Sequence, residues 1–149
     1  MKKALVVGVG PLNGLGAQLC KKIALNNFEV YVAGRTENSI NEVVKSINKD
    51  GNKAKPIVVD VTDEKQTKRM IEEVGSGLDF AIYNVGNNTP GKIIDIEADY
   101  FRKSWETGCF GAFLFSREVI KVFLKEKTSG TLLFTGASAS LRGKANFGA

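Results

Sequence analysis

The stretch ALVVGVGPLNGLG, residues 4–16, decides the fold. Its first six residues are apolar and rich in valine, a pattern typical of a strand that is covered on both faces. Glycines in and after this run allow positive φ and a close approach of backbone to a pyrophosphate, while the amides and dipole of the helix that starts at Gly14 favour the anion. The stretch therefore predicts a nucleotide-binding loop, with a tight turn that binds nothing as the alternative.

The rest of the chain repeats this alternation of strand and helix. Strands are predicted at residues 4–9, 29–33, 54–59, 78–83 and 131–136, and an irregular loop at 84–91. Helices are predicted at residues 14–27, at 40–47 with a cap at Asn38 or Ser39 and a stop at Gly51, from a cap at 62–64 through Val74, and at 101–120. Strands and helices that alternate through short connections form a parallel sheet with helices on both faces.

Composition restricts the possible functions. The 149 residues match one domain, and the net charge of +5 comes from scattered basic pairs, unlike the basic stripe of a nucleic-acid groove. The absence of histidine excludes His-based triads, metal sites and proton shuttles. We therefore expect neither a metal nor a nucleic-acid partner. We also expect no membrane partner, since no apolar run reaches about 18 residues. Cys20 and Cys109 lack a Cys-x-x-Cys spacing, so we expect both to be buried small residues in a cytoplasmic protein.

The residues after the second strand indicate which nucleotide binds. The glycine loop lacks the Gly-Lys-Ser/Thr of a P-loop, which disfavours phosphoryl transfer. An acidic residue after the second strand would bind the ribose hydroxyls of NAD or S-adenosylmethionine, but the chain has Ala33-Gly34-Arg35. The planar donors of arginine match a 2′-phosphate, so NADP is favoured over NAD. The alternative is that Arg35 is a solvated surface charge.

Taken together, these motifs resemble the short-chain dehydrogenase/reductase family. Residues 9–16 are similar to its Thr-Gly-x-x-x-Gly-x-Gly loop, Asp60-Val61 to its adenine-binding Asp, and residues 83–86 to its Asn-Asn-Ala-Gly. Residues 111–113 and 130–140 fall where the family has its Gly-x-Phe and serine-bearing segments. The resemblance implies an α/β fold of Rossmann type, a doubly wound parallel sheet of five strands in the order 3-2-1-4-5, truncated relative to the full family fold.

The resemblance also assigns the cofactor-binding residues, position by position. It implies that the phosphate loop comprises Gly8, Gly10, Asn13, Gly14, Leu15 and Gly16. Arg35 would bind the 2′-phosphate. Asp60 and Val61 would contact the adenine, with helix capping as the alternative for Asp60. Asn84 and Gly86 would line the ribose region, with support of the turn as the alternative for Asn84.

The catalytic residues of the family do not carry over. The position of the family's Asn is occupied by Gly108 and that of its Ser by Ala137, which leaves Ser138, one residue further on, as the candidate. Tyr-x-x-x-Lys does not occur in the sequence, and the family's Tyr would lie just beyond Ala149. We therefore expect residues 1–149 to be a single dinucleotide-binding domain and an amino-terminal fragment of a longer chain, with a natural minimal domain as the alternative.

The expected function is that of an NADP(H)-dependent oxidoreductase that transfers hydride between nicotinamide and a small carbonyl or alcohol substrate, with this chain supplying the cofactor-binding part. The alternative is a non-catalytic NAD(P)-binding module or pseudoenzyme. A hydrolase is disfavoured, because residues 136–140 lack the last glycine of Gly-x-Ser-x-Gly and no histidine is present to activate a serine.

The helix at 101–120 carries an apolar stripe that includes Phe101, Trp105, Phe115 and Val119. In the family the corresponding helix packs against its copy in a dimer, and the small residues Gly108, Gly111 and Ala112 would allow close approach. Packing on the sheet is the other use of the stripe. We expect a homodimer or a larger homo-oligomer.

Overall fold

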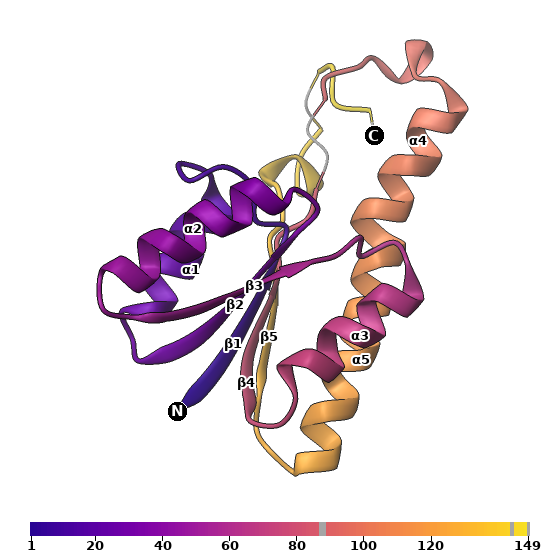
Figure 1. The fold of residues 1–149 in the computed structure, drawn as a ribbon. Helices are drawn as coiled ribbons and strands as arrows, with labels where there is room; N and C mark the ends of the chain where they lie inside the picture. The colour runs from indigo at the N-terminus through magenta and orange to yellow at the C-terminus, as the bar shows by residue number, and fades with distance from the viewer. Residues whose placement is uncertain (87–88, 144, 149) are drawn as a thin grey trace.

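The computed structural model describes residues 1–86, 89–143 and 145–148. Its parallel strands form one five-stranded sheet in the order β3-β2-β1-β4-β5, as Figure 1 shows. The strands are β1 (Lys2–Val7), β2 (Phe28–Gly34), β3 (Lys53–Val58), β4 (Leu78–Tyr83) and β5 (Thr131–Phe134). The Rossmann-type sheet and its strand order are thereby confirmed.

Helices cover both faces of the sheet. On one face lie α1 (Leu15–Ala24) and α2 (Glu37–Lys49), and on the other α3 (Glu64–Val74) and α5 (Gly111–Glu126) (Figure 1). Val6 of β1 packs with residues of α1 and α2, whereas its neighbours Leu5 and Val7 pack with residues of α3 and α5. Leu5, Val6 and Val7 are all fully buried, which explains why β1 is apolar at successive positions.

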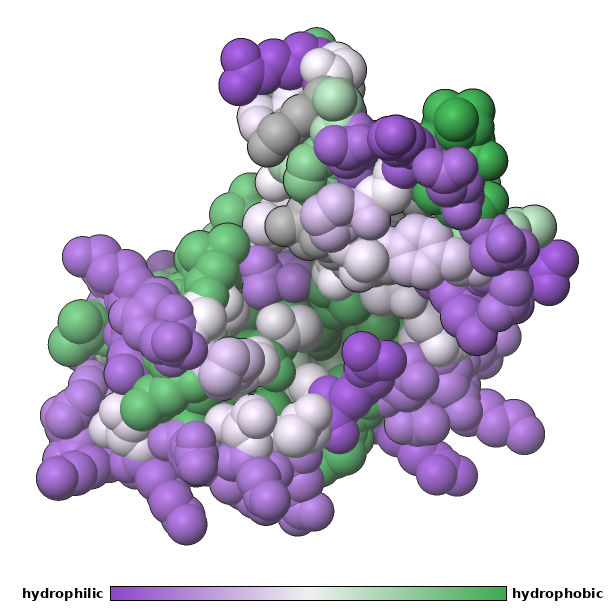
Figure 2. Space-filling model, turned by 90° about the horizontal axis from the view of Figure 1, so that it is seen from above, coloured by the Kyte–Doolittle hydropathy of each residue, from purple (hydrophilic) through white to green (hydrophobic). Residues whose placement is uncertain are grey.

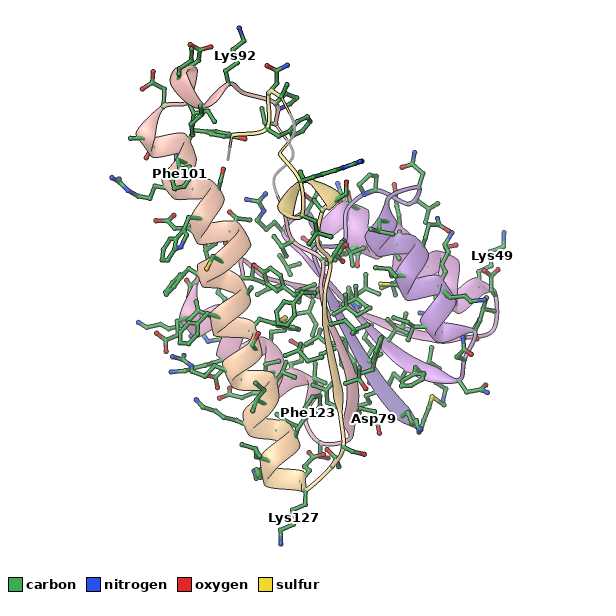
Figure 3. The ribbon with its side chains drawn as sticks, turned by 180° about the vertical axis from the view of Figure 1, so that it is seen from behind. Lys49, Asp79, Lys92, Phe101, Phe123 and Lys127 are labelled. Atoms are coloured by element: carbon green, nitrogen blue, oxygen red, sulfur yellow. The ribbon has the colours of Figure 1, made fainter. Side chains whose placement is uncertain are left out.

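The predicted long helix is present but its regular geometry is interrupted. It starts as α4 (Ala98–Trp105), continues through a π-turn over Glu106–Phe110, and ends as α5. Figure 3 shows Phe101 above the level of the strands and Phe123 and Lys127 at the lower end of the helix. A π-turn inserts an extra residue and so rotates the apolar positions before it away from those after it. Phe115 and Val119 are buried, but Phe101 and Trp105 are each 50% exposed, so the prediction of one continuous stripe was wrong.

Several predicted boundaries need correction. The second helix begins at Glu37 with Thr36 at the N-cap position, so a cap at Asn38 or Ser39 was wrong; both residues lie inside the first turn. Gly51, with φ of 80°, follows the end of this helix as expected. The first strand is displaced toward the N-terminus and ends at Val7, because Gly8 turns the chain out of the sheet. The last strand ends at Phe134, two residues early.

Two segments at the carboxyl edge of the sheet pair with each other. Gly91, in the predicted loop at 84–91, forms an isolated parallel bridge with Phe147. The Gly91 amide donates to the Asn146 carbonyl at 2.6 Å, and the Gly148 amide donates to the Gly91 carbonyl at 3.1 Å. Residues 87 and 88 of this loop lie outside the described residues. Across the described part of the chain, every helix is too short or too polar to cross a membrane.

Candidate functional site

The glycine loop after β1 is held by contacts that only glycine permits. Gly8 has φ of 84°, and a Cβ there would lie 2.5 Å from the backbone of Asn84. A Cβ at Gly16 would lie 2.9 Å from the Gly8 carbonyl oxygen, and one at Gly34 would collide with the Val9 carbonyl oxygen. The loop is therefore packed against the ends of both β2 and β4, with no room for a side chain at these positions.

Asn84 joins the end of β4 to this loop. Its side-chain amide donates to the Gly8 carbonyl at 3.0 Å, and its backbone amide donates to the Val7 carbonyl at 3.0 Å. These bonds support the turn, as the alternative interpretation of Asn84 proposed. Asn84 also borders the cavity described next, so supporting the turn and lining the site are compatible.

A cavity of about 420 Å³ lies at the carboxyl edge of the sheet, beside the glycine loop. Figure 2 looks onto this edge and shows a hollow between the two helical layers. Its lining comes from the loop after β1, the ends of β2, β3 and β4, and the long helix. The lining residues are Gly8, Val9, Gly10, Gly34, Arg35, Thr36, Val59, Asp60, Val61, Thr62, Asn84, Val85, Gly86, Lys103, Glu106 and Thr107. Ligands of open parallel sheets bind at this edge, so the cavity is the candidate site.

Among the predicted residues, Gly10 and Gly86 border open space: a Cβ at either would meet no atom within 4 Å. Arg35 is exposed at the rim and makes no ion pair within the described residues. Val61 is buried at the cavity wall, and its carbonyl accepts from the Thr67 hydroxyl at 3.3 Å. A ligand of suitable size can therefore approach backbone at Gly10 and a free cation at Arg35.

Asp60 lies in the cavity wall between β3 and α3. One carboxylate oxygen, Oδ1, accepts from the Thr62 backbone amide at 3.0 Å and from the Thr62 hydroxyl at 2.7 Å. The N-cap of α3 is Asp63, whose carboxylate accepts from the amides of Lys65 and Gln66. Helix capping by Asp60 was therefore wrong, whereas the predicted acidic cap at 62–64 is confirmed at Asp63. The second oxygen of Asp60 has no hydrogen-bond partner within the part of the chain that is described.

Other predicted loop residues lie beside the cavity without lining it. Asn13, Gly14, Leu15 and Gly16 are in this group. Gly14 is the N-cap of α1 and provides no side-chain cap, and Leu15 is 57% exposed. The first amides of α1 are thus without a side-chain cap, an arrangement that suits an anion.

The π-turn forms the opposite wall. The Tyr83 hydroxyl donates to the Thr107 carbonyl at 2.5 Å, and Thr107, Glu106 and the preceding Lys103 line the cavity. Gly108 lies exposed within this turn. Cys109, also in the turn, is exposed, so its predicted burial was wrong, because the π-turn directs it outward; Cys20 is buried as expected, and burial raises the pKa of its thiol to about 12.

The sequence matches the family description short chain dehydrogenase over residues 2–149. The chain belongs to the short-chain dehydrogenase/reductase family. It is 29% identical over 136 residues to glucose 1-dehydrogenase of Gluconobacter oxydans, a match that covers 89% of this chain and 50% of that protein.

Solved short-chain dehydrogenases share the fold. One from Mycobacterium marinum superposes with a TM-score of 0.90 at 25% identity, covering 96% of this chain and 58% of that one. One from Rhodopseudomonas palustris gives 0.88 at 29% identity, covering 98% and 68%. More distant structures of this fold include a 7α-hydroxysteroid dehydrogenase complexed with NADH and an actinorhodin polyketide ketoreductase with NADPH. The chain spans about half the length of the curated relatives it matches.

Ser138, the residue predicted to be catalytic, begins a short 3₁₀ turn over Ser138–Ser140 after β5. It is exposed and does not line the cavity, and Ala137 precedes it in extended conformation. The structure therefore does not bring Ser138 together with Arg35 and Asp60. Groups of three or more His, Cys, Asp or Glu side chains that could hold a metal are absent from the described residues.

Sequence reasoning missed part of the wall of this candidate site. Lys103, in α4, and Glu106 and Thr107, in the π-turn, were not predicted, because the π-turn follows no apolar periodicity. Gly34 was also missed. Its position as the last residue of β2, directly before Arg35, was the available signal, since the loop after β1 must pass close to the end of that strand.

Proposed function

We propose that this chain binds NADP(H) and supplies the cofactor-binding part of an oxidoreductase that transfers hydride between nicotinamide and a carbonyl or alcohol. The observation that carries this proposal is Arg35, an exposed guanidinium at the end of β2, on the rim of the cavity and without an ion-pair partner in the described residues. Such a guanidinium suits the 2′-phosphate that distinguishes NADP from NAD.

Further features of the cavity and of the adjacent loop support the binding of a dinucleotide. The open space at Gly10 and the uncapped start of α1 suit the pyrophosphate, together with Gly8, Asn13, Gly14, Leu15 and Gly16. Asp60, through its unpartnered carboxylate oxygen, and Val61 would hold the adenine. Asn84 and Gly86 would line the ribose region. The residues present therefore match the group that the family uses.

In this proposal the bound NADP(H) supplies the hydride, and the residues of this chain bind and orient it. Ser138 is the residue we propose to hold the substrate oxygen, because its 3₁₀ turn follows the last described strand at the same edge of the sheet. The substrate is a small carbonyl or alcohol compound, and the protein acts in the cytoplasm.

We also propose that the long helix joins two copies of the chain. Its outer face carries Trp105, Phe110 and Phe113, with ring centroids 5.7 Å and 6.3 Å apart along the row, and Arg117 stands over Phe113 at 5.4 Å. Exposed aromatic clusters of this kind mark association surfaces. Gly111 does not belong to this face, since it is buried against Tyr83, which corrects its predicted part in close approach between copies.

The experiment that tests the cofactor assignment is calorimetric titration with NADPH and, separately, NADH. Arg35→Asp should weaken NADPH binding roughly 5- to 150-fold, the equivalent of about 1–3 kcal/mol for a lost charged hydrogen bond, while NADH changes little. Arg69→Asp makes the same change in charge on an exposed position of α3 and should leave both affinities intact. Equal weakening of both nucleotides by Arg35→Asp would contradict the assignment to the 2′-phosphate.

A further inference from the structure

Tyr83, the last residue of β4, links the sheet to the long helix. It is only 3% exposed, and its ring lies near those of Phe115 and Phe134, at 5.6 Å and 6.4 Å between centroids. Its hydroxyl is 2.5 Å from the carbonyl oxygen of Thr107. The side chain thus extends from the core of the sheet to the π-turn.

The hydrogen bonds of the π-turn account for this contact. The Gly111 amide donates to the Glu106 carbonyl, five residues back, whereas in an α-helix it would donate to the Thr107 carbonyl, four residues back. Tyr83 supplies a donor to that carbonyl instead. Burial and the nearby Asp60 carboxylate raise the pKa of the Tyr83 phenol, so it keeps the proton that it donates.

Gly111 makes room for the tyrosine hydroxyl. A Cβ at this position would lie 2.5 Å from the Tyr83 hydroxyl oxygen and 3.2 Å from the Val61 carbonyl oxygen. Any larger residue at 111 would push the helix away from Tyr83 or displace the phenol. Tyr83 and Gly111 therefore act as a matched pair that fixes the distance between β4 and the long helix.

The residues held in this way line the cavity. Glu106 and Thr107, in the π-turn, and Lys103, one turn earlier, form the wall that faces Arg35 and Asp60. We propose that Tyr83 is a positioning residue for cofactor binding: through the Thr107 carbonyl its hydroxyl holds the π-turn in place and so sets the shape of the cavity wall. This inference rests on the proposed binding of a dinucleotide in the cavity.

The test compares Tyr83→Phe, which removes only the hydroxyl, with Tyr31→Phe. Tyr31 is equally buried at 3% exposure but lies in β2 between Lys3 and Lys55, away from the cavity lining. Tyr83→Phe should weaken NADPH binding by calorimetry roughly threefold to tenfold, the effect of one net hydrogen bond. Tyr31→Phe should leave the affinity for NADPH unchanged, even if it lowers the melting temperature by as much as Tyr83→Phe does.

Trp105 provides a spectroscopic readout of the turn itself. It is the single tryptophan of the chain, it immediately precedes the π-turn, and its ring stacks on Phe110 at 5.7 Å. Its emission without ligand should shift in Tyr83→Phe and stay unchanged in Tyr31→Phe. Gly111→Ala should shift emission and affinity in the same direction as Tyr83→Phe, and it replaces that variant if the latter fails to fold.

The outcomes separate the two proposals. If the unsubstituted chain binds neither NADPH nor NADH, the proposed function fails, and a shift of Trp105 emission in Tyr83→Phe alone still supports the role of Tyr83 in holding the turn. If the unsubstituted chain binds NADPH but Tyr83→Phe matches Tyr31→Phe in both affinity and emission, the positioning role of Tyr83 is overturned while the proposed function stands.

Discussion

Strands β1 and β5 are similarly apolar in sequence but differ in what covers them. Ala4, Leu5, Val6 and Val7 of β1 are fully buried between two layers of helices. In β5, Leu133 is 47% and Phe134 54% exposed. Apolar runs therefore indicate that a surface must be covered, but they do not identify the covering element. In β1 that element belongs to the described chain, whereas the exposed side chains of β5 form an apolar surface available for association.

The first glycine after each of the two strands offers the sharpest contrast. Gly8→Val should prevent folding, with a loss above about 5 kcal/mol, because valine tolerates positive φ poorly and its Cβ would meet the Asn84 backbone at 2.5 Å. At Gly136, after β5, a Cβ meets no atom within 4 Å, so Gly136→Val should leave the fold intact. Circular dichroism and urea denaturation measure both variants. A folded Gly8→Val protein would show that the β1 side is less tightly packed than described.

Truncation of a leucine in each strand tests the comparison directly. Leu5→Ala should cost about 2–5 kcal/mol in the free energy of unfolding, the usual effect of a large cavity in a closed core. Leu133→Ala should cost less than about 1 kcal/mol, since its side chain is half exposed. Urea denaturation at several protein concentrations gives both values. A cost at Leu133 that approaches the Leu5 value and grows with concentration would mean that a second copy covers β5.

A carboxylate on α5, in one of the two helical layers that cover β1, makes the fold sensitive to acid. Burial opposes ionisation of Glu118 on α5, but Lys121 and Arg117, at 2.9 Å each, outweigh it and hold its pKa below the usual value. A lowered pKa stabilises the fold fully above the ordinary pKa of about 4.3, and this contribution is lost as pH falls from there through the lowered pKa of the folded state. Glu118→Gln should lower the melting temperature by a few degrees at neutral pH, and its difference from the unsubstituted chain should shrink in acid.

The control for this smallest effect is Glu72→Gln, on an exposed position of α3. It should leave the melting temperature unchanged across the same pH range. A gap between Glu118→Gln and the unsubstituted chain that stays constant down to strongly acidic pH would contradict the assigned ion pairs.

Much of the fold could be predicted because the relevant signals are local. The apolar runs located every strand, and residues 78–83 of β4 were predicted with the observed bounds. Arg35 was placed at the site because it directly follows β2, whereas Asp60 and Gly86 were assigned through the resemblance to the family motifs. All three line the cavity, because the ends of parallel strands meet at one edge. The π-turn could not be predicted, since a change in helical hydrogen bonding leaves no mark in apolar spacing. The partnership of Tyr83 with Thr107 depends on two segments 24 residues apart.

The bridge between Gly91 and Phe147 couples two loops that leave different strands. Two backbone hydrogen bonds join them, and the Cβ of any residue at 148 would press on the Ile93 backbone at 2.9 Å. Neither loop can move far without breaking those bonds or carrying the other along. The segments after β4 and β5 are therefore coupled in their motion at the open edge of the sheet. A ligand that displaces one of them must also displace the other or break the hydrogen bonds between them.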